Sequence, residues 1–228
     1  MRSPDLDVTV PGTLDNPSID GTIDPGEWSH AWSVDMSIVP GFPVWMYVQH
    51  DGNYLYIAVE DTSDSTLDAY DSIGIFFDDD GGVPPLLYDN LWTATSCPAD
   101  EGNFWLGNFA PDPDDLFQGW IAGPASCPLQ YGGTNVAIAY SLNGGSMNWE
   151  AAIDLGLSAL QVSTGETFGL FAYSYRFGTS GPSGMWPETS DLQFHATYAH
   201  VTLGLIGGLP FADGFESGDT SAWSATVP

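Results

Sequence analysis

Basic residues are almost missing from this chain. Its 228 residues include no lysine and only two arginines, Arg2 and Arg176, against 30 acidic residues, so the formal net charge is -28. A surface of that sign repels nucleic acid and anionic membranes, and we expect neither as a partner. Because salt bridges within the chain cannot neutralise so many carboxylates, calcium is the natural counterion. Charge for solubility, or adaptation to high salt, is the alternative.

Cysteines are scarce, and long apolar runs are absent. Cys97 and Cys127 are the two cysteines, each within a Ser-Cys-Pro sequence. A disulfide between them, contributing roughly 2–4 kcal/mol, would staple the intervening segment and would imply an oxidising compartment. Two free thiols are the alternative. No stretch is apolar enough to span a membrane, and no hydrophobic signal region opens the chain. We expect an extracellular, secreted protein whose signal peptide is not part of this sequence.

Helix signals are also weak, whereas strand signals are dense. The segment 155–162 alone predicts a short helical turn. Strands are predicted at 44–50, 54–60, 72–77, 135–141, 147–153, 167–176 and 194–203. An Asp-Gly-Asn sequence at 51–53 predicts a hairpin turn between the first two. Short strands separated by Gly, Asn and Asp turns predict an all-β fold, an antiparallel β-sandwich.

Two segments depart from this pattern. Residues 83–133 carry aromatics and prolines without a clear period, and we interpret them as a long insertion that holds the predicted disulfide. The sandwich domain then covers residues 1–205. Residues 206–228 form a C-terminal tail beyond the last predicted strand, and we interpret this tail as a donor strand or an anchoring segment.

Nine tryptophans are many for a chain of this length. Sugars stack on aromatic rings while a few well-placed polar groups bind their edges. Three tryptophans in the insertion and one in a Gly/Pro-rich segment are the candidate ligand-binding residues: Trp92, Trp105, Trp120 and Trp186. Packing within the insertion, or contact with another subunit, is the alternative. Trp28, Trp32 and Trp149 are assigned to the core.

Acidic residues cluster around one predicted strand. Asp78, Asp79 and Asp80 end it and are followed by two glycines, which allow a turn that gathers the three side chains. Asp61 and Asp71 precede the strand, and we predict that these acids bind calcium. A solvated strand end is the alternative. A second acidic group, Asp24 and Glu27, lies in a Gly- and Pro-containing segment that suits either a turn or a metal ligand.

Catalytic motifs are missing. With 30 acidic residues, paired carboxylates of the glycosidase kind arise by chance. The four histidines show no metal-ligand spacing, and neither a Gly-x-Ser-x-Gly elbow nor a phosphate-binding loop is present. We therefore expect a protein that binds or assembles and is not an enzyme.

Several segments resemble a known family. Residues 19–28 have the sequence Ile-Asp-Gly-Thr-Ile-Asp-Pro-Gly-Glu-Trp, the hairpin 52–61 ends in Val-Glu-Asp, and 149–153 is Trp-Glu-Ala-Ala-Ile. Together with the acidic strand end at 71–80, these motifs are similar to those of family-nine carbohydrate-binding modules and their DOMON-like relatives. The resemblance covers roughly 17–205 and implies a jelly-roll-like β-sandwich with structural calcium. It also implies a ligand held between aromatic side chains, although some relatives bind haem. The tail resembles a C-terminal element of secreted bacterial proteins.

Two functions follow from these features. The first is non-catalytic binding of a polysaccharide or glycan through exposed aromatics, on a calcium-stabilised sandwich. The second is a structural subunit of an extracellular filament or surface assembly, in which copies of the chain are joined by calcium and by strand addition from the tail.

Overall fold

The structure, a computed structural model, describes residues 7–66, 71–78, 101–107, 120–122, 130–131, 136–157, 160–176, 178–188 and 197–206. These residues form β-strands and contain no α-helix, which confirms the all-β prediction, and none of them belongs to a helix able to cross a membrane. The strands are β1 Asp7–Gly12, β2 Trp32–Asp35, β3 Val44–His50, β4 Tyr54–Asp61, β5 Ser72–Asp78, β6 Glu101–Gly107, β7 Trp120–Ala122, β8 Gln130–Tyr131, β9 Val136–Asn143, β10 Ser146–Asp154, β11 Gly156–Leu157, β12 Leu160–Gln161, β13 Thr167–Tyr175, β14 Gly184–Trp186 and β15 Ala199–Ile206.

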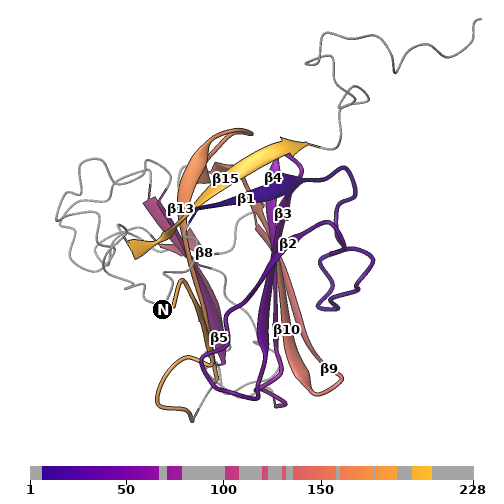
Figure 1. Cartoon of the computed structure of the whole chain (residues 1–228), viewed down its shortest axis with the longest axis vertical. Coiled ribbons are helices and arrows are strands. Elements are labelled where there is room, and N and C mark those ends of the chain that lie inside the picture. The colour runs from indigo at the N-terminus through magenta and orange to yellow at the C-terminus, as the bar shows by residue number, and fades with distance from the viewer. Residues whose placement is uncertain are drawn as a thin grey trace, which may run out of the picture.

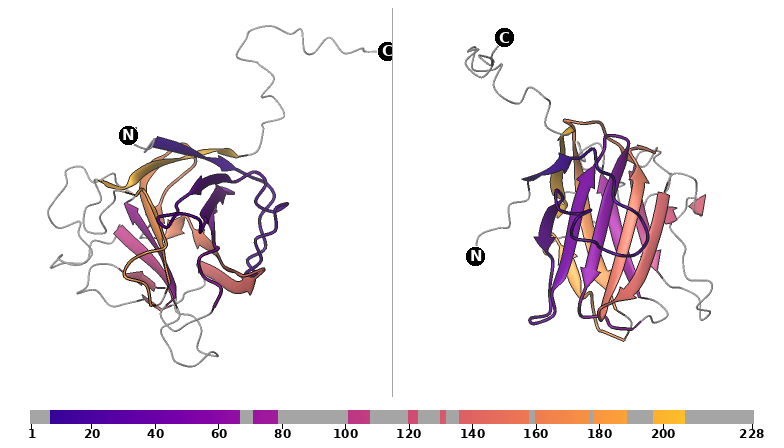
Figure 2. Two further views of the ribbon diagram at one scale, coloured as in Figure 1. Left: turned by 60° about the horizontal axis from the view of Figure 1, so that its bottom comes forward. Right: turned by 90° about the vertical axis from the view of Figure 1, so that its right-hand side faces the viewer.

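One curled sheet contains nearly all of these strands. Its order is β8-β7-β6-β5-β13-β15-β1-β3-β4-β10-β9, with β14 paired to β13 and β2 paired to β3. The sheet bends back on itself, so that β3, β4, β10 and β9 form one layer and β5 and β13 belong to the facing layer (Figure 1 and Figure 2). We call the first of these, together with β2, the front layer.

The hydrophobic core lies between the two layers. Along β3, Val44, Met46 and Val48 are fully buried, as the alternation of side chains on a strand requires. They share one buried cluster with residues of β5 and β13 from the facing layer. Because alternate residues point to opposite faces, Trp45 and Tyr47 of β3 lie on the outer face of the front layer.

Strand β1 joins the two layers. It pairs in parallel with β15 on one side and with β3 on the other. Val10 is fully buried within it, and Thr13 just beyond donates its backbone N–H to the carbonyl of His50, with an N–O distance of 2.7 Å. The His50 side chain is also fully buried, and this burial lowers its pKa. We call the β15-β1-β3 contact the seam.

The predicted strands agree with β3, β4, β5, β9, β10, β13 and β15, with shifted ends. The predicted helical turn at 155–162 is wrong, because its described residues form β11 and β12, which pair with each other. Leu155, Leu160 and Val162 all face the core there. The segment 83–133, predicted as an insertion, contributes β6, β7 and β8 beside β5. The last strand continues to Ile206, and the jelly-roll arrangement stays a prediction.

Candidate functional site

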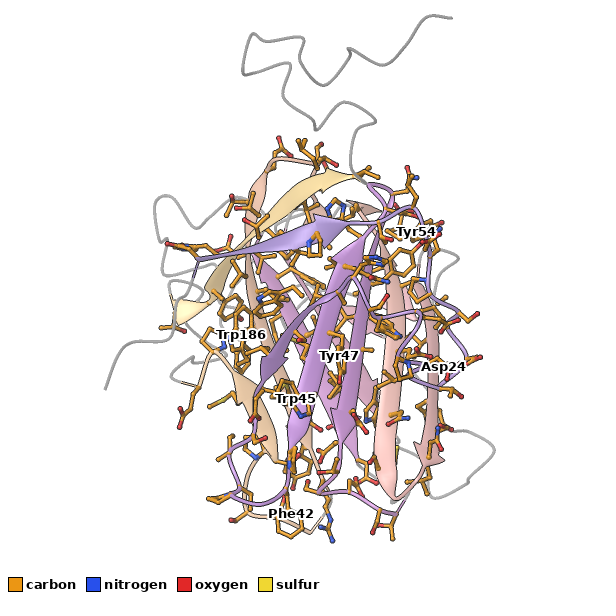
Figure 3. The ribbon with its side chains drawn as sticks, turned by 45° about the vertical axis from the view of Figure 1, so that its right-hand side comes forward. Asp24, Phe42, Trp45, Tyr47, Tyr54 and Trp186 are labelled. Carbon is orange, nitrogen blue, oxygen red and sulfur yellow. The ribbon has the colours of Figure 1, made fainter. Side chains whose placement is uncertain are left out.

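A long loop covers part of the outer face of the front layer. This covering loop, residues 13–31, follows β1 and leads into β2. Its Trp28 is buried against Tyr56 and Ala58 of β4 and Ala152 of β10. The ring of Trp28 also lies 6.3 Å from that of Tyr47, measured between centroids. Figure 3 shows the part of the loop that carries Asp24 in front of the sheet.

One carboxylate holds the covering loop in place. Glu150 of β10 is fully buried, and its Oε2 accepts the backbone N–H groups of Asp20 and Gly21 at 3.0 and 2.7 Å. Its Oε1 accepts the indole N–H of Trp28 at 3.1 Å. Burial raises the pKa of Glu150, and the three hydrogen bonds oppose that rise. The covering loop therefore depends on an acid 122–130 residues away in the sequence.

A row of side chains crosses the outer face of the front layer beside the covering loop, and Asp35, Trp45 and Glu60 are its exposed or partly exposed members. Directly paired residues of antiparallel strands share a face. The register places five such residues side by side across β2, β3, β4, β10 and β9: Asp35, Trp45, Glu60, Asn148 and Ser141. We call these five residues the acidic-aromatic row. Trp45 and Tyr47 follow each other along the outer face of β3 in Figure 3.

Carboxylates flank Trp45 on both sides. Asp35 is exposed, and its Oδ1 accepts the backbone N–H of Ser37 at 3.0 Å as well as the Ser37 hydroxyl, which lowers the Asp35 pKa. Glu60 is half-buried. The pKa of Tyr47 is raised, first by burial and then by the Glu60 charge, so the Glu60 carboxylate lies near the phenol. The row thus combines an indole face with charged hydrogen-bond acceptors.

The tryptophans singled out from the sequence differ in burial and location. Trp186 is buried in the core, and its ring centroid lies 5.0 Å from that of Trp32. Because its ring is not exposed, Trp186 is not part of the candidate site. Trp28 and Trp149 are buried as predicted, and Trp32 is partly buried. Trp105 of β6 is paired with Trp120 of β7, so the backbone brings these two together. Trp92 lies outside the described residues, as do Cys97 and Cys127.

Asp61 and Asp71 lie in a buried acidic cluster with Asp64, another of the acids that precede β5 in the sequence. All three are buried, and the charges of Asp71 and Asp61 add to burial in raising the pKa of Asp64 to about 6. The hydroxyls of Ser174 and Ser183 donate to Asp61 Oδ2, the former at 2.6 Å.

Asp78 does not belong to that cluster. Asp71 comes just before β5 and Asp78 is its last residue, so an extended strand of seven residues separates them by about 23 Å. Asp71 and Asp78 therefore cannot contact one calcium ion together, and calcium binding by these acids stays a prediction. Asp79 and Asp80 lie outside the described residues.

Asp24 and Glu27 take part in a turn of the covering loop. The carbonyl of Asp24 accepts the backbone N–H groups of Glu27 and Trp28 at 3.0 and 3.3 Å, and the Asp24 side chain is exposed. Within the part of the chain that the structure describes, no group of three or more His, Cys, Asp or Glu side chains is arranged to hold a metal ion.

Comparison with known proteins identifies the fold. No family model and no curated protein matches the chain. Among solved structures, it resembles a family 9 carbohydrate-binding module from Caldicellulosiruptor kristjanssonii. The structure with cellotriose is 15% identical, with a TM-score of 0.56 over 97% of this chain and 98% of that one. The structure with glucose is 16% identical, with a TM-score of 0.58 over 90% and 99%.

A Bacteroides uniformis protein, described provisionally as carbohydrate-binding, is also similar. It is 14% identical, with a TM-score of 0.52 over 86% of this chain and 98% of that one. The fold therefore places this chain among the β-sandwich proteins. More closely, it has the fold of family 9 carbohydrate-binding modules, as the sequence motifs indicated.

Proposed function

We propose that this chain is a non-catalytic carbohydrate-binding domain and that its glycan lies along the acidic-aromatic row. The observation that carries the proposal is Trp45, which is only partly buried on an outer sheet face and is flanked by polar groups that can bind hydroxyls. The fold supports it, because the similar Caldicellulosiruptor module was solved with cellotriose and with glucose.

The chemistry of the row suits a sugar. The flat indole of Trp45 accommodates the apolar face of a pyranose ring, and Tyr47 lies two residues further along the same strand for a second contact. Asp35 and Glu60 accept hydrogen bonds from hydroxyls at the ring edge. Because the β-strands fix these side chains before any ligand arrives, binding requires little ordering of the protein.

Replacing Trp45 with alanine is expected to weaken glycan binding at least about tenfold, because an aromatic contact at the centre of a site contributes about 2 kcal/mol or more. The measurement is affinity electrophoresis against a panel of soluble polysaccharides, followed by calorimetry with the best ligand. The substitution removes an outer-face side chain and leaves the buried face of β3 intact.

Phe42→Ala is the matched control for Trp45→Ala. Phe42 is 50% exposed, and it lies in the loop before β3, below Trp45 in the view of Figure 3 and outside the row. We expect Phe42→Ala to bind like the wild type. Loss of binding in Trp105→Ala and Trp120→Ala, with Trp45→Ala unaffected, would place the site on β6 and β7 instead.

We also propose that calcium binds at the acidic cluster of Asp61, Asp64 and Asp71 and stabilises the sandwich. The donor chemistry fits, since calcium prefers carboxylate and hydroxyl oxygens and Arg176 is the one cation near Asp64 among the described residues. Ser174 and Ser183 bring two further oxygens to Asp61. In the described geometry these three acids do not surround one ion, so calcium binding requires their carboxylates to reorient and takes further oxygens from water or from other residues of the chain.

Removing calcium with a chelator is expected to lower Tm by about 5–10 °C, if the ion is present at about 100 times its dissociation constant. Thermal denaturation with and without added calcium measures this shift. Asp61→Asn should abolish the calcium response, while Asp24→Asn, in the exposed turn, should retain it. An unchanged Tm in the wild type would disprove calcium stabilisation.

The alternative function, an extracellular assembly subunit, gains no support from the described residues. Its donor strand would be the tail, and residues 207–228 lie outside the described part of the chain. Secretion and the absence of catalysis also stay predictions. Electron microscopy of the protein with calcium and with a chelator would test for assembly, and regular fibres that dissolve on chelation would support it.

A further inference from the structure

The acidic-aromatic row places carboxylate acceptors on both sides of Trp45, and its N–H donors are the Trp45 indole and the Asn148 amide. Glu60 is half-buried, and neither of its carboxylate oxygens accepts a hydrogen bond from another described residue. Asp35 has one oxygen engaged by Ser37, and its Oδ2 has no hydrogen-bond partner in the described part of the chain. Ser141 donates its hydroxyl to the carbonyl of Gly21 at 2.6 Å, so that hydrogen is already used.

Asn148 adds a buried acceptor to the same row. Its side chain is 4% exposed, and its Oδ1 has no hydrogen-bond partner among the described residues. The register places it next to Glu60 on β4, on the outer face. A buried polar atom without a partner costs about 1–3 kcal/mol, and a ligand N–H group that reached this covered oxygen, after a small shift of the side chains over it, would offset that cost.

Among the residues that the structure describes, the charges of the row have no counterion. The chain contains no lysine, and its one described arginine, Arg176, donates to the carbonyl of Ser63 at 2.6 Å. Within the described ranges, neither Asp35 nor Glu60 forms an ion pair; the ion pair found there joins His200 to Asp7. The indole of Trp45 therefore lies between two carboxylates whose charge is left uncompensated.

A protonated amine has the chemistry that matches this arrangement. An ammonium group carries three N–H donors and no acceptor, and it is attracted to the face of an indole as well as to carboxylates. A neutral sugar hydroxyl gains only the hydrogen bonds, and a uronic acid or sulfated sugar is repelled. Among glycans, the class with such a group is the amino sugars whose nitrogen is not acetylated.

We infer that the acidic-aromatic row recognises amine-bearing glycans, with glucosamine polymers as the ligand class, and prefers them to neutral and anionic glycans. This inference rests on the proposed carbohydrate-binding function. Trp45 stacks on a sugar ring, and Glu60 and Asp35 bind the ammonium group of the same or the adjacent sugar.

Calorimetry with the full chain tests this inference with four probes: a glucosamine tetramer, its fully N-acetylated counterpart, cellotetraose and a galacturonate tetramer. We expect the glucosamine tetramer to bind at least about tenfold more tightly than its acetylated form, and the galacturonate tetramer not to bind. The preference should weaken as the pH rises and the sugar amines lose their protons, and also as salt is added.

Two variants distinguish binding at a specific site from nonspecific attraction of the amine to a negatively charged protein. Glu60→Gln should lose most of the preference for the amine while its affinity for cellotetraose changes less than about threefold. Asp7→Asn removes the same charge from an exposed carboxylate on β1 and should keep the preference. An equal loss in both variants would show that net charge alone attracts the polymer and would overturn the inference.

The remaining outcomes are also decisive. Equal affinity for the glucosamine tetramer and its acetylated counterpart, or for cellotetraose, would overturn the inference and leave the carbohydrate-binding function intact. Absence of binding to every tetramer and to the polysaccharide panel would refute the carbohydrate-binding function itself, and the inference with it.

Discussion

Replacing Glu150 with alanine is expected to lower the free energy of unfolding by about 3 kcal/mol and to release the covering loop from the sheet. Glu150 is fully buried and accepts three hydrogen bonds from that loop. Alanine provides no acceptor, so the backbone N–H groups of Asp20 and Gly21 and the indole N–H of Trp28 lose their partner together. Each donor must then reach water or remain unsatisfied, and both outcomes separate Trp28 from its packing site.

Chemical denaturation measures the loss of stability, and hydrogen exchange measures the release of the loop. In Glu150→Ala, the amides of Asp20 and Gly21 should exchange faster than they do in the wild type. The amides of the β4–β10 ladder should change less. Glu166→Ala is a matched control, because Glu166 is exposed and accepts one backbone N–H, that of Ser163, at 2.8 Å. We expect its effect to stay near 0.5–1 kcal/mol, roughly one solvent-accessible hydrogen bond.

A double-mutant cycle isolates the bond between Glu150 and Trp28. Glu150→Gln keeps one oxygen for the two backbone donors but places an amide N–H₂ near the indole N–H. Trp28→Phe removes that indole donor. If the geometry is correct, the double variant is more stable than the sum of the single effects predicts, by about 0.5–3 kcal/mol. Strict additivity would show that the two side chains do not interact, contrary to the structure.

The sequence predicted the β-sandwich and the motif at 19–28, but not the contact that joins this motif to the sheet. The segment 19–28 and the Trp149-Glu150 pair were both recognised as parts of one family pattern. Their pairing across more than a hundred residues is a tertiary contact, and local alternation carries no information about it. Conversely, the alternation in 44–48 indicates which residues of β3 share a face, but not which face is covered. Trp45 was therefore not singled out.

Trp186 shows why an exposed aromatic cannot be inferred from loop-forming neighbours. Glycine and proline around it predicted a surface loop, but Gly184–Trp186 pairs with β13 as β14. There Trp186 packs on Trp32 of the opposite layer, and no periodic pattern in three residues could show this. The segment 155–162 was misassigned for a related reason, since short apolar runs fit helices and strands equally well.

Strand β1 was not predicted at all, because its partners are distant. Asp7–Gly12 contains a proline, and five of its six residues pair in parallel with β15, near the other end of the described chain. Parallel pairing of this kind is set by the closing of the sheet, so the seam emerges only from the tertiary structure. The seam also depends on Gly12, where β1 lies against the backbone of β15.

Gly12→Ala is expected to destabilise the protein by at least about 3 kcal/mol, because the two strands meet at this glycine without room for a side chain. A Cβ at position 12 would lie 2.5 Å from the Cα of Ile206 and 2.7 Å from the carbonyl oxygen of Leu205. Both are backbone atoms, so neither can rotate away. The clash is relieved only if β1 separates from β15, and this opens the seam above the buried Val10 and His50.

Gly26→Ala provides the control for this effect. A Cβ there would have no atom within 4 Å, so we expect stability within about 0.5 kcal/mol of the wild type. Urea denaturation compares the two variants, and limited proteolysis should cut Gly12→Ala near its N-terminus first. If Gly12→Ala unfolds like the wild type, the parallel contact between β1 and β15 is not made, and the two layers must be held together by the remaining strands.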